Sequence, residues 1–403
     1  RCAIVTGVQT CALPIWYLPR MIARKNETNL VLEALAAFPA VGIIGARQVG
    51  KTTLAGMISQ KWSGPVHHFD LENSEDLARL FDPMLTIKEL DGLVILDEVQ
   101  RMPEIYQTLR VLIDRTRNGR RFLILGSASP QLLQQSSESL AGRIKYHRLS
   151  GLGLDEISSD QSGQLWLRGC FPLSFSAPDD TKSFEWRKAF IATFLERDLP
   201  QLGINVSSTR LRRFWNMLAH YHGQIWNASE FARSFGVADT TVRQYLDRLT
   251  DALVVRQIQP WHENISKRQV KSPKVFICDS GLTHALLNLP TEHDVLGHPK
   301  SGASWEGFVI EQIIRLFRAD ESECFHWATH SGAELDFLHI RGLDRTGFEI
   351  KKTSAPRLTR SMHIAMHDLK LKQLFVIHAG EHSFPLAENI KAVPVSRLSE
   401  ILA

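Results

Sequence analysis

The sequence predicts an α/β protein that opens with a parallel, doubly wound sheet and continues into a helical segment and a second α/β domain. Three observations predict this fold. Short apolar runs alternate with helical segments through the first 150 residues, a glycine-rich loop follows the first run, and two acids end the third. At 403 residues the chain is also too long for one ordinary domain.

Changes in pattern divide the chain into four expected parts, residues 1–15, 16–150, 151–260 and 261–403. The first part contains VTGVQTCALPI (residues 5–15), which resembles the translation of a sequencing-adaptor oligonucleotide. It has none of the basic, apolar and small-residue order of a signal peptide. We therefore leave residues 1–15 out of the fold and expect no chemistry at Cys11.

The composition excludes several classes of protein. The content of 44% hydrophobic and 22% charged residues is typical of a globular chain, and a formal charge of +4 permits a nucleic-acid partner without indicating one. The longest apolar run is interrupted by Glu33 and Pro39, so we expect no membrane helix. Five cysteines without CxxC spacing argue against a zinc site or a disulfide framework and favour a reducing cytoplasm.

The first predicted strand, Val41–Ile44, leads into GARQVGKTT and then into the helical TLAGMISQKW. This is the pattern G-x-x-x-x-G-K-[ST] between a strand and a helix, which predicts a phosphate-binding loop. Glycines let backbone N–H groups surround phosphate oxygens, and the helix N-terminus adds partial positive charge. We expect ATP to bind along the loop, at Gly45, Ala46, Arg47, Gln48, Val49, Gly50, Lys51, Thr52 and Thr53.

Within this loop, Lys51 is expected to reach the β- and γ-phosphates and Thr52 to ligate Mg²⁺. The apolar strand GLVILDEVQ ends in Asp97 and Glu98. A carboxylate at the carboxyl end of a central strand lies beside such a loop. We therefore expect Asp97 to hold the Mg²⁺ shell and Glu98 to polarise the attacking water.

Three further residues are weaker candidates for the same site. Ser127 follows the strand RFLILG and either lies between phosphate and water or caps a helix. Arg143, just before a later strand, either stabilises transferred phosphate charge in its own or a neighbouring subunit or is an ordinary surface arginine. Arg197, in FLERDLP, is a still weaker candidate.

The remaining strands of the first domain follow the same alternation with helices, which predicts a parallel sheet. They are expected at Val66–Phe69, Val94–Asp97, Phe122–Gly126 and Ile144–Leu149.

The middle of the chain is predominantly helical. FEWRKAFIATFLERDLPQL predicts one helix, and two short helices follow, separated by a turn at Gly236. The second is expected to turn four residues inward: Val242, Tyr245, Leu246 and Leu249. With the β-rich ALVVRQIQPW behind them, these helices predict a winged helix-turn-helix.

The charges of this unit do not decide its partner. The presumed recognition helix balances Arg243 and Arg248 against Asp239 and Asp247, which favours packing or protein contact over DNA. The nearby SKRQVKSPK, with basic residues up to Lys274, keeps DNA contact open.

The tail predicts an amphipathic helix, SWEGFVIEQIIRLFRA, then strands in CFHWATHS, AELDFLHI, TGFEIKK and QLFVIHAG. Strand alternation places Asp336 opposite Leu335 and Phe337, and projects Glu349 and Lys351 together. If these strands pair, Asp336 and Glu349 can bind a divalent metal and Lys351 can orient water. The metal shell would be completed by Glu306 or Glu311. This is the layout of a restriction-endonuclease-like core, although such acids also occur on ordinary solvated faces.

A series of motifs together resembles the prokaryotic AAA-type ATP-binding proteins that end in a domain of unknown function: GARQVGKTTLA, LDEVQRMPEI, LGSAS, SLAGR, RGCFPLSF, FLERDL and KVFICDSGL. The resemblance runs from Tyr17 to the C-terminus. It implies a AAA-like P-loop ATPase, a winged helix and a nuclease-like C-terminal fold. It carries the nucleotide roles onto Gly45, Gly50, Lys51, Thr52, Asp97 and Glu98. RGCFP departs from the pattern with Cys170, which bears on packing.

Three functions follow as hypotheses. The first is an ATP-driven, Mg²⁺-dependent switch whose nucleotide state changes how the ATPase domain contacts the C-terminal half. The second is an ATP-regulated DNA nuclease that uses Asp336, Glu349 and Lys351. The third is an adaptor that binds ATP without hydrolysis and recruits a protein partner. Oligomerisation is compatible with all three.

Overall fold

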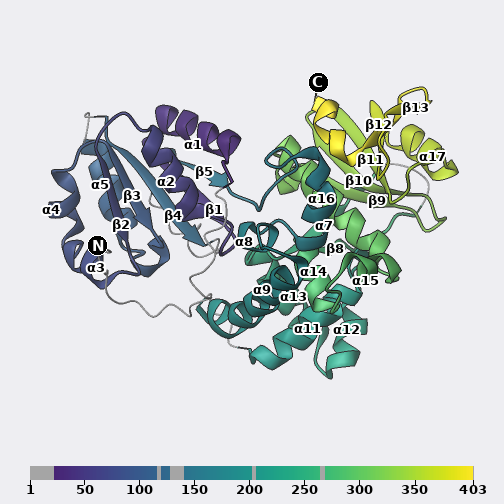
Figure 1. Cartoon of the computed structure of the whole chain (residues 1–403), viewed down its shortest axis with the longest axis horizontal. Coiled ribbons are helices and arrows are strands. Elements are labelled where there is room, and N and C mark those ends of the chain that lie inside the picture. The colour runs from purple at the N-terminus through teal and green to yellow at the C-terminus, as the bar shows by residue number, and fades with distance from the viewer. Residues whose placement is uncertain (1–21, 116–118, 128–139, 202–205, 264–267, 403) are drawn as a thin grey trace.

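A computed structural model describes residues 22–115, 119–127, 140–201, 206–263 and 268–402. An α/β domain from the first part of the chain lies beside a helical middle, which continues into a sheet formed by the C-terminal part (Figure 1). The adaptor-like residues 1–15 lie outside the described residues.

The first sheet confirms the predicted parallel strands. Each predicted strand is present, with shifts of one residue at the ends, and every pairing between neighbours is parallel. The strand order is β2-β3-β4-β1-β5. The strands are β1 (Ala40–Gly45), β2 (Val66–Asp70), β3 (Leu93–Asp97), β4 (Arg121–Ser127) and β5 (Ile144–Arg148).

Helices cover both faces of this sheet, as a doubly wound fold requires (Figure 1). Helices α1 (Lys25–Ala37) and α2 (Lys51–Lys61) pack on the face that carries Ile43 and Leu123. Helices α4 (Pro83–Lys88) and α5 (Ile105–Arg115) pack on the face that carries Phe122. Alternate strand residues thus feed two cores. The short elements α3 (Ser74–Arg79) and η1 (Val99–Arg101) complete the domain.

The predicted middle helix is interrupted. Helix α9 (Asp180–Thr193) is followed by a π-helical turn, η3 (Phe194–Asp198), before α10 (Leu199–Gln201). Pro200 explains the interruption, because it has no N–H for the carbonyl of Glu196 and its ring crowds that carbonyl.

The middle of the chain contains further helices besides α9. They are η2 (Ser159–Gln161), α7 (Ser162–Arg168), α8 (Pro172–Phe175), α11 (Ser208–His220), α12 (Ala228–Phe235), α13 (Asp239–Asp251), α14 (Ser280–Leu286) and α15 (Glu292–Gly297). Gly236 ends α12 with a left-handed φ of 64°, and the four predicted inward residues of α13 are all buried.

A nine-stranded sheet joins the middle to the C-terminal part, in the order β13-β14-β12-β11-β10-β9-β7-β8-β6. It continues across residue 260, where we had expected a boundary, because β7 pairs in parallel with β9. The strands are β6 (Gln224–Ile225), β7 (Val255–Pro260), β8 (Lys274–Ile277), β9 (Cys324–Ala328), β10 (Glu334–Arg341), β11 (Asp344–Lys351), β12 (Gln373–His378), β13 (Phe384–Ala387) and β14 (Ile390–Pro394).

Two helices flank the C-terminal strands. Helix α16 (Ser301–Phe317) packs with Phe337, Phe348 and Ile377, while α17 (Arg360–Asp368) packs with other residues of the same strands, such as Leu335. The remaining short helices are η4 (Glu321–Glu323) and η5 (Val395–Leu402).

One expectation about this sheet is wrong. Leu335 and Phe337 were expected to share a face, but they belong to different cores. The register between β10 and β9 shifts between Leu335 and Leu338, and such a bulge breaks strict alternation. Phe348 and Ile350, by contrast, do share the face toward α16.

Among the described residues, no helix combines the length and apolar content needed to cross a bilayer. The cysteines in that part of the chain, Cys170, Cys278 and Cys324, are free thiols.

The motifs RGCFPLSF and KVFICDSGL of the sequence meet at Gly169. Gly169 ends α7 with φ of 81°, and a Cβ there would lie 2.2 Å from an Asp279 oxygen. That carboxylate caps α14 through the amide of Leu282 and also accepts from the amide of Cys170. We therefore expect Gly169→Ala to lower the free energy of unfolding by roughly 2–4 kcal/mol, because strain and a clash add up.

Chemical denaturation measures this loss of stability, and Gly163→Ala, in the same helix α7, is the matched control. A Cβ at Gly163 meets no atom within 4 Å, so Gly163→Ala should be neutral or stabilise by up to about 1 kcal/mol. Equal effects of the two substitutions would contradict this role of Gly169.

Candidate nucleotide site and its contacts with the C-terminal half

The loop between β1 and α2 forms the predicted cradle. Gln48 and Gly50 adopt left-handed φ angles of 64° and 96°, which turn the backbone so that α2 begins at Lys51. Gly45 is required by space, since a Cβ there would lie 2.3 Å from the carbonyl oxygen of Leu149. The loop thus presents backbone amides and a helix N-terminus at the carboxyl edge of the sheet.

Lys51 is buried in this loop, with 6% of its surface exposed. Its ammonium donates to the carbonyl oxygens of Gly45 (3.2 Å) and Ala46 (3.1 Å). Burial lowers the pKa of Lys51, while the negative charges of Glu98 and Asp97 oppose the shift. A buried cation beside an anion-binding loop is suited to a polyphosphate.

The predicted metal ligands lie together. The Thr52 hydroxyl donates to Asp97 at 2.7 Å, and Asp97 also accepts from the amide of Glu98 at 2.9 Å. These oxygen donors fit Mg²⁺, which prefers hydroxyl and carboxylate oxygen. Glu98 has a left-handed φ of 53° and accepts from the side chain of Gln100. Backbone strain of this kind is concentrated at functional sites.

Ser127 and Arg143 lie at opposite edges of the sheet. Ser127 pairs with Gly45 at the ends of β4 and β1, so its backbone is next to the loop. Arg143 is at the amino edge, where its carbonyl accepts from the amide of Ala40, and its guanidinium binds Asp114 at 2.7 Å. A role for Arg143 at the loop of its own chain is therefore wrong, because residues before a parallel strand lie away from its carboxyl end.

Arg197 lies close to the loop and belongs to a cluster that the sequence analysis missed. Arg47 of the loop binds Asp198 at 2.8 Å, and Glu72 is shared by Arg47 (3.6 Å), Arg101 (3.2 Å) and Arg197 (3.7 Å). The motif FLERDL was noticed, but nothing in the sequence places its Asp198 against a loop 151 residues earlier.

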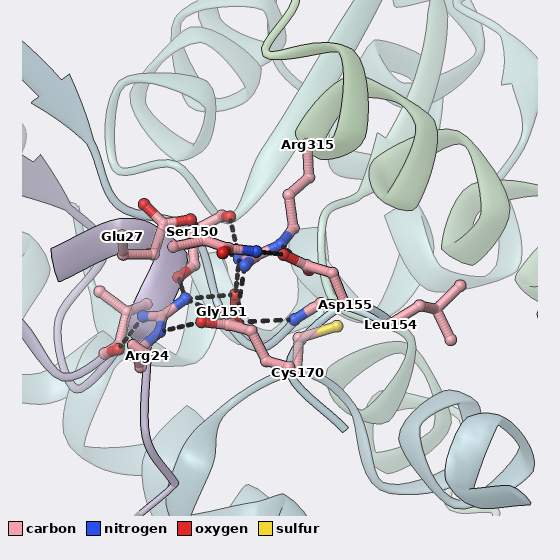
Figure 2. A network of polar contacts seen from close by, with 12 residues as sticks. Arg24, Glu27, Ser150, Gly151, Leu154, Asp155, Cys170 and Arg315 are labelled. Carbon is pink, nitrogen blue, oxygen red and sulfur yellow. Dashed lines mark hydrogen bonds and ion pairs between the residues drawn. The ribbon is translucent and has the colours of Figure 1, made fainter. Parts of the chain in front are cut away.

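A second cluster joins the first α/β domain to α16 (Figure 2). Arg24, before α1, donates to the carbonyl oxygens of Val49, Ser150 and Gly151 and pairs with Glu156 at 2.8 Å. Arg24 therefore contacts the phosphate-binding loop at the carbonyl oxygen of Val49.

Arg315 of α16 approaches the same backbone from the other side (Figure 2). It donates to the Gly151 carbonyl oxygen at 2.7 Å and pairs with Glu156 (2.6 Å) and with Glu27 of α1 (3.2 Å). Glu156 thus links the two arginines. We call Arg24, Glu27, Glu156 and Arg315 the hinge cluster.

The acids of the tail are buried and neutralised by lysines. Lys351 binds Glu349 at 2.6 Å and lies 4.0 Å from Asp336. Lys274, one of the basic residues that kept DNA contact open, lies against Glu306 and 3.8 Å from Asp336. Burial and the charge of Asp336 raise the pKa of Glu349, and Lys351 opposes the shift.

This arrangement differs both from a simple metal shell and from the alternative, an ordinary solvated face. One oxygen of Glu349 is buried without a hydrogen-bond partner. Glu311, the alternative ligand, binds Arg256 instead. Over the ranges that the structure describes, no three acidic, histidine or cysteine side chains gather as metal ligands.

Family models match three consecutive segments of the chain. Residues 37–158 match an AAA domain, residues 159–293 match a domain of unknown function (DUF8612), and residues 301–398 match another (DUF4143).

Two curated relatives span nearly the whole chain. They are the uncharacterised proteins Rv2008c of Mycobacterium tuberculosis (strain ATCC 25618 / H37Rv) and Mb2031c of Mycobacterium bovis (strain ATCC BAA-935 / AF2122/97). Each is 48% identical over 379 residues, which cover 94% of this chain and 85% of the relative. Among solved structures, the Walker-type ATPase PABY2304 of Pyrococcus abyssi is similar with a TM-score of 0.50 and 16% identity, over 66% of this chain and 96% of its own. That likeness supports the fold.

The hinge cluster predicts a stability that depends on pH. Burial alone would raise the pKa of Glu27, but its hydrogen bond to His147 and the charge of Arg315 lower it to about 2. A depressed carboxyl pKa stabilises the fold above its ordinary value of 4.5 and loses that effect as the pH falls toward 2. Glu27→Gln should therefore cost roughly 3 kcal/mol at pH 7 and about half as much at pH 3.

Denaturation of the parent and the variant at both pH values measures this difference. Glu33→Gln, at an exposed position on the same helix, is the control and should change little at either pH. A Glu27→Gln effect that is equal at pH 7 and pH 3 would rule out the proposed ion pairing.

Proposed function

The chain belongs to the family of P-loop ATPases in which an AAA domain is followed by a C-terminal DUF4143 domain, and we propose that it is a Mg²⁺-dependent ATPase that works as a nucleotide-driven switch. One observation carries this proposal. The buried ammonium of Lys51 lies in a loop of backbone amides beside Asp97 and Glu98.

Each part of the site has a role in phosphoryl transfer. The amides of residues 46–53 and the ammonium of Lys51 bind the β- and γ-phosphates. Thr52 and Asp97, already in contact, hold Mg²⁺, which offsets phosphate charge. Glu98 polarises the attacking water, and the backbone of Ser127 ends the strand next to β1.

The switch rests on two contacts between the site and the rest of the chain. In the first contact, Arg47 of the loop binds Asp198. In the second, the hinge cluster connects the loop carbonyl of Val49 to α16 through Arg24, Glu156 and Arg315. A nucleotide that moves the loop changes both contacts, and a ligand shifts an equilibrium only through such differential contacts.

We propose that the order of α11, β6, α12, α13, β7 and β8 is a winged helix. Support comes from the sheet, in which β8 pairs antiparallel with both β6 and β7.

The partners and location of the chain are also proposals. The balanced charges of the winged-helix unit favour a protein partner over DNA. An oligomer in which Arg143 acts on a neighbouring subunit is compatible with its position at the sheet edge. Free thiols at Cys170, Cys278 and Cys324 support a reducing compartment such as the cytoplasm.

The ATPase proposal is tested by nucleotide binding and turnover. Lys51→Ala should weaken ATP binding roughly 100-fold, because it removes a buried cation from the phosphates. Glu98→Gln should bind ATP normally and hydrolyse it roughly 10²–10⁴-fold more slowly. Lys61→Ala, at an exposed position on the same helix, is the control and should leave both unchanged.

Calorimetric titration and phosphate release measure these quantities. Unchanged hydrolysis by Lys51→Ala would end the ATPase proposal. Unchanged hydrolysis by Glu98→Gln alone would remove only the role of Glu98, and ATP binding without turnover by the parent would favour the adaptor function.

A DNA nuclease is the second candidate function. Asp336, Glu349 and Lys351 lie together on β10 and β11, and α16, β9, β10, β11, α17 and β12 follow one another as in a restriction-endonuclease-like core. Lys274 argues against activity, because its ammonium lies among the acids that would have to bind a divalent metal.

We therefore expect no cleavage when the protein is incubated with plasmid DNA and Mg²⁺ or Mn²⁺, with or without ATP. Plasmid relaxation or linearisation followed on a gel is the measurement. Cleavage by the parent that Glu349→Gln abolishes would overturn this expectation and establish the nuclease. Cleavage that persists in Glu349→Gln would identify a contaminant.

A further inference from the structure

The ion pair between Arg47 and Asp198 joins the phosphate-binding loop directly to the helical middle. Arg47 Nη1 lies 2.8 Å from Asp198 Oδ1, and the Asp198 side chain is 8% exposed. The other side of the guanidinium faces Glu72 at 3.6 Å. A loop arginine is therefore held by two carboxylates, and one of them is almost completely buried.

Asp198 also lies close enough to the reacting end of the site for their charges to interact. Burial raises the pKa of Asp198, the charges of Arg47 and Arg197 oppose the shift, and the negative charge of Glu98 adds to it. The negative charge of Asp198 in turn opposes the lowering of the pKa of Lys51 by burial. The carboxylate thus lies within electrostatic reach of the expected phosphate cation and of the expected catalytic acid.

Asp198 belongs to the π-helical turn η3, which packs into the helical core. The ring of Phe194 in this turn stacks on the ring of Phe190 in α9, with 5.7 Å between their centroids, and lies 5.4 Å from the ring of Trp215 in α11 by the same measure. π-Helical turns are rare in proteins, and those that occur are often found at functional sites. The turn η3 therefore packs directly on α11, in the same hydrophobic core as α12 and α13.

We propose that Asp198 is a positioning residue that couples the presence of the γ-phosphate to the helical middle of the chain. The inference rests on the proposed ATPase function and specifies how the nucleotide state reaches the C-terminal half. Without a γ-phosphate, Asp198 holds Arg47. The γ-phosphate of ATP adds negative charge beside Lys51, competes with Asp198 for the guanidinium, and repels the buried carboxylate.

The consequence is a coupling between the γ-phosphate and η3. ATP binding releases Arg47 from Asp198 and shifts η3 in the core, whereas ADP leaves the pair in place. Part of the ATP binding energy is spent on separating this pair, so the native Asp198 lowers the preference for ATP over ADP.

The test compares dissociation constants for ADP and for the non-hydrolysable analogue AMP-PNP, each with Mg²⁺, by calorimetry on the full chain. Asp198→Asn keeps the shape and removes the charge that competes for Arg47. We expect the ratio of the ADP to the AMP-PNP dissociation constant to rise about tenfold, within the usual range of coupling between sites. Glu196→Gln, an exposed acid on the same π-helical turn, should leave the ratio unchanged.

An unchanged ratio in Asp198→Asn, or an equal change in both affinities, overturns the inference, because a purely structural role affects both nucleotides alike. If Asp198→Asn does not fold, Arg47→Gln decides instead. It should weaken AMP-PNP about tenfold and ADP less than twofold, and an equal loss for both overturns the inference. Failure of the parent to bind either nucleotide would instead contradict the proposed function itself.

Discussion

The burial of the Lys51 ammonium inside a loop of backbone amides is the constraint on which the rest of the structure depends. A buried cation is costly unless opposite charge and hydrogen-bond acceptors surround it. Two loop carbonyls accept from it, and the negative charges of Asp97 and Glu98 support it from the end of β3, on the far side of β4. This arrangement exists only because β1 and β3 are parallel strands of one sheet, so that their carboxyl ends lie at the same edge.

The same edge of the sheet is where the C-terminal half makes contact with the loop. Arg47 reaches forward to Asp198 of the helical middle, and Arg24 reaches the carbonyl of Val49 from behind, in contact with Glu156 and through it with Arg315. Both contacts use arginine, whose planar guanidinium binds several oxygen atoms at once. The loop therefore has polar connections on two sides, and a change in its shape affects both the π-helical turn and α16.

Features of the structure that depend on residues close together in the sequence could be predicted. The strands of the first sheet, the cradle and the Thr52–Asp97 contact follow from short apolar runs and one motif whose geometry is set by neighbouring residues. The C-terminal strands and the pairing of Glu349 with Lys351 follow from strand alternation. The bulge between Leu335 and Leu338 did not follow, because alternation assumes a regular ladder. Contacts across long sequence distances, such as those of Asp198, Lys274 and Arg315, have no local signal in the sequence.

A crystal structure with AMP-PNP and Mg²⁺ tests the central claim most directly. The β- and γ-phosphates should lie against the amides of residues 46–53 and the ammonium of Lys51, with the metal ligated by the Thr52 hydroxyl and held near Asp97. The guanidinium of Arg47 should have left Asp198 for the γ-phosphate. A nucleotide bound elsewhere, or a loop whose amides turn away from the phosphates, would contradict the account.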